Sequence, residues 1–105
     1  MDSKTRERVE RISEMEERLN RCVEASDQLS AACKQWREIV EDSRILEEYY
    51  QGDDWMEDFE ADERGELPND LLRGVLSEDA LYDYISDRQE LAKELLRTAL
   101  AALES

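Results

Sequence analysis

The side chains best able to do chemistry are carboxylates and aromatic rings gathered between residues 41 and 66. This segment holds twelve acidic and two basic residues, a net charge of −10, while the whole chain of 105 residues carries −15. Tyr49, Tyr50, Trp55 and Phe59 lie in the same segment. Carboxylates attract Lys and Arg side chains, and the rings offer contact area, so the segment favours a docking surface for a basic protein.

Two other interpretations of this acidic and aromatic segment stay open. In the first, the rings close the end of a helical structure and the acids form a solvated rim. In the second, carboxylates three and four residues apart share a helix face and hold Mg²⁺ or Ca²⁺ at Asp53, Asp54, Glu57 and Asp58. The calcium-loop spacing D-x-[DN]-x-[DN]-G is absent, so we predict no metal site and no cofactor. The predicted partner-binding residues are Tyr49, Tyr50, Trp55, Asp54, Glu57 and Asp58.

The chain lacks the residues on which most catalytic sites depend. It contains no histidine, which is the commonest general base and the usual partner of a nucleophilic Ser or Cys. Its three glycines form neither GxGxxG nor GxxxxGK[ST], the loops that cradle phosphates. On one helix Cys22 and Cys33 would stand about 16 Å apart, beyond the ~7 Å that a disulfide allows. We therefore expect two reduced cysteines and no enzyme activity.

A long helix must precede the acidic segment. No Gly or Pro interrupts the chain between about Thr5 and Tyr50, and good helix formers dominate, which predicts one helix over residues 5–50. Its apolar or small residues recur with alternating gaps of three and four, the heptad spacing of a coiled-coil seam. The seam residues are Ile12, Met15, Leu19, Cys22, Ser26, Leu29, Cys33, Trp36 and Val40.

Glycines and a proline then mark a linker over residues 51–76. Asp53 or Asp54 can cap a short helix that Gly65 ends. Pro68 can start one further turn, through Leu71 and Leu72, that Gly74 stops. The linker is therefore expected to hold one or two short helices.

The last predicted helix spans residues 77–104. Ser77 followed by two acids is a good N-cap, and a wide apolar stripe follows at helical spacing. No stretch of the chain alternates with period two, as a half-buried strand would. The elements together predict an all-α fold in a single domain of residues 1–105, a long antiparallel, coiled-coil-like helical hairpin with an acidic and aromatic linker.

The two predicted long helices differ in length. The last one covers the first only back to about Cys22, which leaves an apolar N-terminal stripe uncovered. Such a stripe favours self-association, here as a homodimer through the N-terminal helix. Two alternatives remain: the segment around Trp55 folds back over the stripe, or the long helix bends and covers itself.

Arg73 is one of only two basic residues near the acidic cluster. A guanidinium among carboxylates is more often a structural clamp than a binding group, and we expect it to bond Asp58, Glu60 or Asp70. Gly65 and Gly74 complete this predicted clamp, because glycine supplies backbone turns that other residues resist.

The segment from Leu46 to Tyr82, which includes the linker, also carries a recognisable sequence pattern. It comprises Leu46-Glu47-Glu48-Tyr49-Tyr50, Trp55, Asp58, Glu60, Asp62, Gly65, Leu67-Pro68, Asp70-Leu71, Arg73 through Asp79, and Leu81-Tyr82. This pattern resembles a family of small, acidic, helical bacterial proteins that is catalogued as a domain of unknown function. The resemblance covers most of the chain and is specific between Leu46 and Tyr82. It implies a bacterial or phage-borne cytoplasmic protein and brings no activity, cofactor or site residue.

The charge of −15 also restricts the partners. It repels phosphate backbones and anionic lipid heads, so direct nucleic-acid and membrane binding are disfavoured. No apolar run approaches about 18–20 residues, and the start MDSKTRERVERISEM lacks the apolar core of a secretory signal. These features predict a cytoplasmic protein.

We therefore expect a non-catalytic interaction module that binds a protein partner, basic or nucleic-acid-binding, through the linker end. The alternative is a nucleic-acid mimic that inhibits a DNA- or RNA-binding protein, as anti-defence proteins of phages do. Helical carboxylates three to four residues apart lie ~5–6 Å from one another, comparable to phosphate spacing. A mimic needs a long, continuous face of negative charge, and the neutral segment 1–22 argues against such a face along the whole chain.

Overall fold

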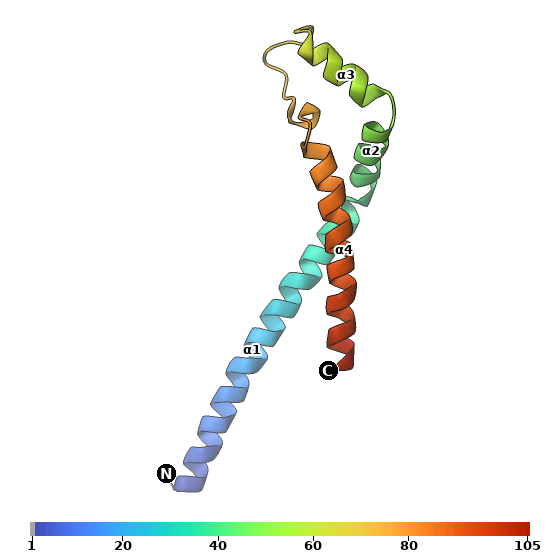
Figure 1. Ribbon diagram of the computed structural model, residues 1–105. Helices are drawn as coiled ribbons and strands as arrows, with labels where there is room; N and C mark the ends of the chain where they lie inside the picture. Colours follow the sequence, from blue (N-terminus) through green and yellow to red (C-terminus); the bar gives the residue numbers. More distant parts are fainter. Residues whose placement is uncertain (1) are drawn as a thin grey trace. The chain divides into compact units, whose positions relative to one another are not determined.

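The computed structural model describes residues 2–105, and its regular elements are all helical, with no strand among these residues (Figure 1). This confirms the predicted all-α class. The helices are α1 (Ser3–Glu38), α2 (Val40–Gln51), α3 (Asp54–Glu63) and α4 (Ala80–Glu104), and a 3₁₀ turn, η1 (Gly74–Leu76), precedes α4. The chain divides into two compact units, one that ends at Val40 and one that comprises Glu41–Ser105, here called the hairpin unit.

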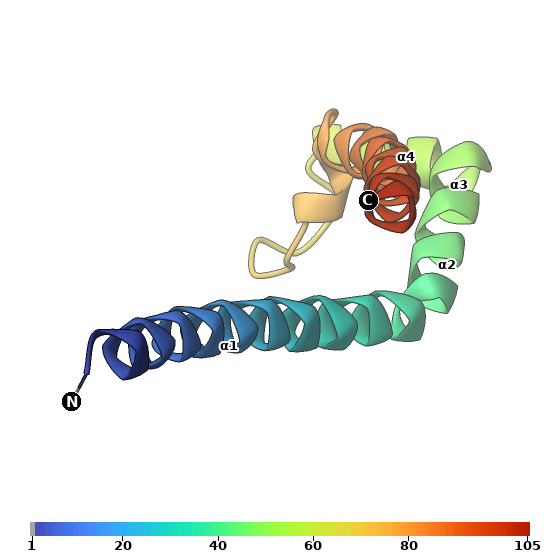
Figure 2. The ribbon, with the colours of Figure 1, turned by 90° about the horizontal axis from the view of Figure 1, so that it is seen from below.

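Helix α1 is one uninterrupted helix of 36 residues (Figure 2). Its first turn is capped by Asp2, whose carboxylate accepts the backbone N–H of Thr5 at 2.7 Å. That bond, together with the Thr5 side chain, holds the pKa of Asp2 below its usual value, since both favour the charged carboxylate. None of the residues of α1 is buried.

The predicted single helix over residues 5–50 is wrong at one residue. Ile39, with φ −97° and ψ 7°, interrupts it, and α2 starts at Val40. Both residues are β-branched, and the stiffness of such side chains weakens a helix. Because neither glycine nor proline marks the break, the residue pattern gave no sign of it.

Helices α2 and α4 form the two arms of the hairpin, and Figure 1 shows them running in opposite directions. Their polar contacts come from long side chains of α4. The hydroxyl of Tyr84 donates to Ser43 Oγ at 2.9 Å, and Arg88 donates to the carboxylate of Glu47 at 2.7 Å. Ser43 is only 2% exposed, so its bond to Tyr84 satisfies a hydroxyl that burial would otherwise leave unpaired.

A small core closes the end of the hairpin. Trp55, Leu76 and Leu81 are its buried side chains, contributed by α3, η1 and α4. The indole N–H of Trp55 donates to the carbonyl of Val75 at 2.9 Å, which ties α3 to η1. Partly buried side chains pack around these three: Leu46, Tyr49, Tyr50, Phe59, Leu67 and Val75.

Helix α3 ends as the sequence predicted, at Gly65. This glycine has φ +73°, and the backbone N–H groups of Gly65 and Glu66 donate to the carbonyls of Asp62 and Ala61. Those two bonds are the Schellman pattern, which requires a left-handed residue at this position. Asp53 precedes α3 but makes no capping bond with its side chain.

The rest of the linker differs from the prediction. Pro68 starts only a hydrogen-bonded turn, in which Leu71 N–H donates to its carbonyl at 3.2 Å, and Gly74 begins the 3₁₀ turn rather than stopping a helix. The final helix starts at Ala80, three residues later than predicted. Its N-cap residue is Asp79 rather than the predicted Ser77, although the Ser77 hydroxyl accepts the N–H of Ala80 at 3.2 Å.

The two linker glycines allow a matched prediction. Gly65→Ala should destabilise the hairpin unit by about 1–2 kcal/mol, since a left-handed conformation strains any residue with a Cβ. Gly74→Ala should stay within about 0.5 kcal/mol, because its φ is not positive and an added Cβ would meet no atom within 4 Å. Urea denaturation of both variants measures the difference, and equal losses would contradict it.

Among residues 2–105, no helix is both long enough and apolar enough to cross a membrane.

Candidate protein-interaction site

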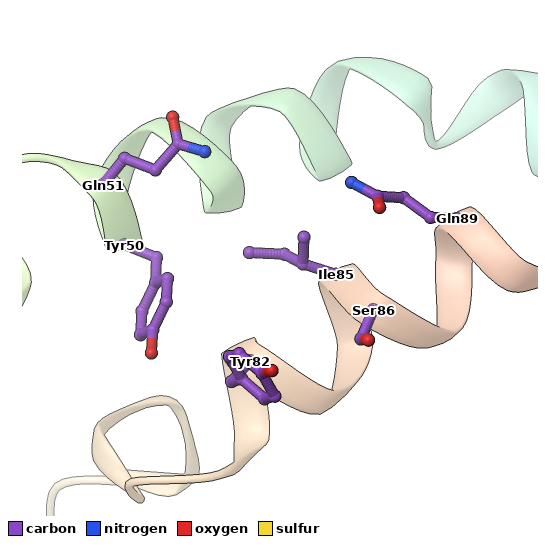
Figure 3. A pocket seen from close by; sticks show the side chains of 6 residues that line it. All are labelled: Tyr50, Gln51, Tyr82, Ile85, Ser86 and Gln89. Carbon is purple, nitrogen blue, oxygen red and sulfur yellow. The ribbon is translucent and has the colours of Figure 1, made fainter.

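An open groove lies between α2 and α4 in the hairpin unit (Figure 3). It has a volume of about 280 Å³. Figure 3 shows Ile85 reaching from α4 toward α2, with a tyrosine of each helix at one end of the groove. All six lining side chains are uncharged, in a chain of which 41% is charged: Tyr50, Gln51, Tyr82, Ile85, Ser86 and Gln89.

The tyrosine of α2 is held in place by the core. The ring of Tyr50 meets the ring of Trp55 edge to face, with centroids 5.1 Å apart and planes at 68°. Trp55 in turn stacks on Phe59 at 5.2 Å and 17°. Since this aromatic row is anchored by the buried indole, Tyr50 is presented to the groove without further ordering.

The tyrosine of α4 is free to make contacts. Tyr82 is 62% exposed. Together the two tyrosine rings, the glutamine carbonyls and the Ser86 hydroxyl can surround an ammonium or guanidinium group with π faces and hydrogen-bond acceptors. The groove is thus chemically suited to a Lys or Arg side chain.

Helix α3 begins three residues after Gln51 of the groove, and most of its carboxylates are exposed and form no ion pair among residues 2–105. The two basic residues of the segment 41–66 are used locally: Arg44 pairs with Glu41 and Glu48, and Arg64 pairs with Glu66 at 2.8 Å. Six exposed carboxylates enter none of the ion pairs found in residues 2–105, and they are Asp53, Asp54, Glu57, Asp58, Glu60 and Glu63.

One of these carboxylates is bound to a tyrosine. The hydroxyl of Tyr49 donates to Asp58 Oδ2 at 2.6 Å. Burial of the ring first, and then the neighbouring charge and bond of Asp58, raise the pKa of Tyr49 to about 12, since each disfavours the phenolate. Tyr49 therefore stays neutral and binds α2 to α3.

This raised pKa predicts how stability depends on pH. A tyrosine that holds its proton more tightly when folded contributes stability that is fully present below its unfolded pKa of 10.0 and is lost as the pH rises toward about 12. Wild-type protein should therefore lose stability between pH 10 and 12, and Tyr49→Phe should lose less in that window. Denaturation at pH 9 and pH 11 measures this, and parallel losses in the two proteins would refute it.

The predicted partner-binding residues differ in their burial and location in the structure. Trp55 is 8% exposed and belongs to the core, so it is no contact residue for a partner. Tyr49 is partly buried and bonded to Asp58, whereas Tyr50 lines the groove. The exposed carboxylates Asp54, Glu57 and Asp58 lie on α3.

The sequence reasoning missed most of the groove. Gln51, Ser86 and Gln89 fit no motif, and their meeting depends on how α2 and α4 pack. For Tyr82 the available signal was its place at the end of the sequence pattern that begins at Leu46, and it lies in the first turn of α4. The alternative of a divalent-cation site gains no support, because no three His, Cys, Asp or Glu side chains of residues 2–105 form a group that could hold a metal ion.

Arg73 ties the linker loop together, though not through the residues we expected. Its guanidinium bonds the carboxylate of Asp62 and the carbonyl of Pro68, and its Nε donates to the carbonyl of Leu71 at 3.3 Å. Asp58, Glu60 and Asp70 are not its partners. The partner is Asp62 because this residue, in the last turn of α3, is partly buried and faces the returning loop.

Comparison with known proteins identifies the family. The family model "Domain of unknown function (DUF4298)" matches residues 12–98, most of the chain. The chain therefore belongs to this family, which confirms the resemblance seen in the linker. No curated protein and no solved structure matches the chain.

Proposed function

We propose that this DUF4298 chain is a non-catalytic interaction module that binds a basic segment of a partner protein in the tyrosine groove, with α3 as its acidic rim. The observation that carries the proposal is the contrast between the two surfaces. An uncharged groove lined by Tyr50 and Tyr82 is followed in the chain, three residues after Gln51, by a helix whose exposed carboxylates enter no ion pair among residues 2–105.

The groove and the acidic rim lie close to each other along the chain. Asp53 and Asp54 follow Gln51 by two and three residues, so they lie within about 11 Å of the groove along the backbone. Their field raises the local concentration of a positively charged segment and speeds encounter. The rings then hold one Lys or Arg side chain at short range, where a cation–π contact contributes ~0.5–2 kcal/mol.

The test is fluorescence anisotropy with dye-labelled, lysine-rich and arginine-rich peptides. Tyr82→Ala leaves the net charge unchanged and should weaken binding about fivefold to tenfold, the equivalent of one cation–π contact. Asp53→Asn with Asp54→Asn should also weaken binding and flatten its dependence on salt. The matched charge control is Glu94→Gln with Glu104→Gln, two exposed carboxylates of α4 without ion pairs, which should bind as wild type does.

The outcomes separate this proposal from the nucleic-acid mimic. If Tyr82→Ala binds as wild type does while every pair of neutralised carboxylates weakens binding equally, charge alone drives association and the groove proposal fails. In that case inhibition of a nuclease that fades steeply with salt would support mimicry. Loss of binding in Tyr82→Ala, with the α4 charge control unaffected, supports the groove.

A further inference from the structure

Helix α1 carries an apolar seam from Ile12 to Trp36 in which no residue is buried and only Cys33 and Trp36 are partly covered. Ile12, Met15, Leu19 and Leu29 are each at least half exposed, and they keep the heptad spacing of a coiled coil. An exposed apolar stripe of this extent is typical of an association surface.

The distribution of charge indicates which occupant fits. The span Ser3–Glu38 contains eight acidic and eight basic residues and is neutral. The rest of the chain keeps 21 of the 29 acidic and 6 of the 14 basic residues, which is the entire net charge of −15. Two copies of this chain therefore repel each other everywhere except along α1, and there an apolar seam meets a neutral surface.

We infer that α1 pairs with α1 of a second copy in an antiparallel two-stranded coiled coil. The hairpin unit follows the C-terminal end of α1, so a parallel pair would bring two strongly acidic units to the same end. An antiparallel pair centred on Glu24 places those ends about 42 Å apart, several times the ~8 Å screening length at physiological salt. Charge repulsion thus selects the antiparallel orientation.

The seam also specifies a register. When Leu19 lies opposite Leu29 of the second copy, all eight seam positions from Ile12 to Trp36 are paired. Cys22 then faces Ser26, and the small residues meet at the centre of the dimer. In this register residues 10–38 of the two helices overlap in a strip of about 43 Å by 10 Å, so the pair buries about 870 Å² in total, below the usual range of stable specific interfaces. We therefore expect a dimer that dissociates on dilution.

Sedimentation equilibrium of the full chain in reducing buffer tests the dimer. The mass should rise with concentration from 12.4 kDa toward twice that value. Leu19→Glu should keep the single-chain mass at every concentration, because it puts a charge in the seam. Ala31→Glu adds the same charge on the opposite face of α1 and is the matched control, which should dimerise as wild type does.

A charge-swap mixture tests the orientation. Leu29→Lys alone should also be monomeric. An equimolar mixture of Leu19→Glu and Leu29→Lys should regain the dimer mass, because only the antiparallel register sets the new carboxylate opposite the new ammonium. Mild oxidation of the wild-type chain gives a second readout, since a parallel pair sets Cys22 against its own counterpart and would form a disulfide.

Three results would overturn the inference. A single-chain mass at all concentrations would mean that the seam is covered by another part of the same chain or by a different protein. A mixture that stays monomeric, or rapid formation of the Cys22 disulfide, would exclude the antiparallel pair. The α1 variants should bind the basic peptides as wild type does, so failure of the dimer is distinguishable from failure of the groove.

Discussion

Replacing Trp55 with alanine should unfold the hairpin unit. The indole fills the centre of a core with only three buried apolar side chains, and removal of a buried Trp costs about 3–5 kcal/mol. At ~0.05–0.15 kcal/mol per residue, a unit of 65 residues has a total stability of about 3–10 kcal/mol. The loss therefore approaches the whole stability. Near-UV circular dichroism and thermal denaturation measure it.

Two further variants separate the contributions of the indole. Trp55→Phe keeps a ring in the core but leaves the carbonyl of Val75 without its donor, so it should cost less, about 1–3 kcal/mol. Tyr82→Ala removes an exposed ring and should change stability by no more than about 0.5 kcal/mol. If Trp55→Ala melted as Tyr82→Ala does, the buried row of rings would not be the core of this unit.

The second large effect is expected at Arg73. Arg73→Ala should destabilise the hairpin unit by about 2–3 kcal/mol, because it removes three bonds and leaves the partly buried carboxylate of Asp62 without a cation. Arg73→Lys keeps the charge but not the planar fork, so an intermediate loss is expected. Chemical denaturation gives the size of the effect, and hydrogen exchange shows whether the loop after α3 opens first.

The chain offers a matched control for this clamp. Arg64 pairs with Glu66 at the surface, where both side chains are more than half exposed. Arg64→Ala should therefore cost less than about 1 kcal/mol. Equal losses in Arg64→Ala and Arg73→Ala would show that Arg73 is one more surface ion pair. The loop that Arg73 clamps also carries Leu72, whose side chain is 94% exposed. Because this side chain is almost fully in solvent, Leu72→Ala should leave the stability of the hairpin unit unchanged.

Local signals predicted the helices of the hairpin unit well. A cap at Asp53 or Asp54 and a stop at Gly65 predicted α3, and the apolar stripe after Ser77 predicted α4. These features act over three to five residues, so a single sequence contains them. The break at Ile39 was missed because β-branched residues weaken a helix by only a few tenths of a kcal/mol and leave no distinctive pattern.

The candidate site was predictable only in its composition. The excess of carboxylates and rings between residues 41 and 66 predicted a docking surface there, but not which rings face solvent. The sequence predicts that Trp55 contacts a partner, whereas tertiary packing against η1 buries it, in line with the alternative that the rings close the end of the helical structure. Similarly, the loop conformation, which the sequence does not encode locally, gave Arg73 the partner Asp62 rather than one of its predicted neighbours.

The most direct test of the central claim is nuclear magnetic resonance mapping of a lysine-rich peptide on the full chain. Recognition through the groove predicts that the largest shifts fall on Tyr50, Tyr82 and Gln89, with smaller shifts along α3 and none on α1. Shifts spread evenly over all acidic residues, or concentrated on α1, would contradict the claim that the tyrosine groove and its acidic rim form the binding site.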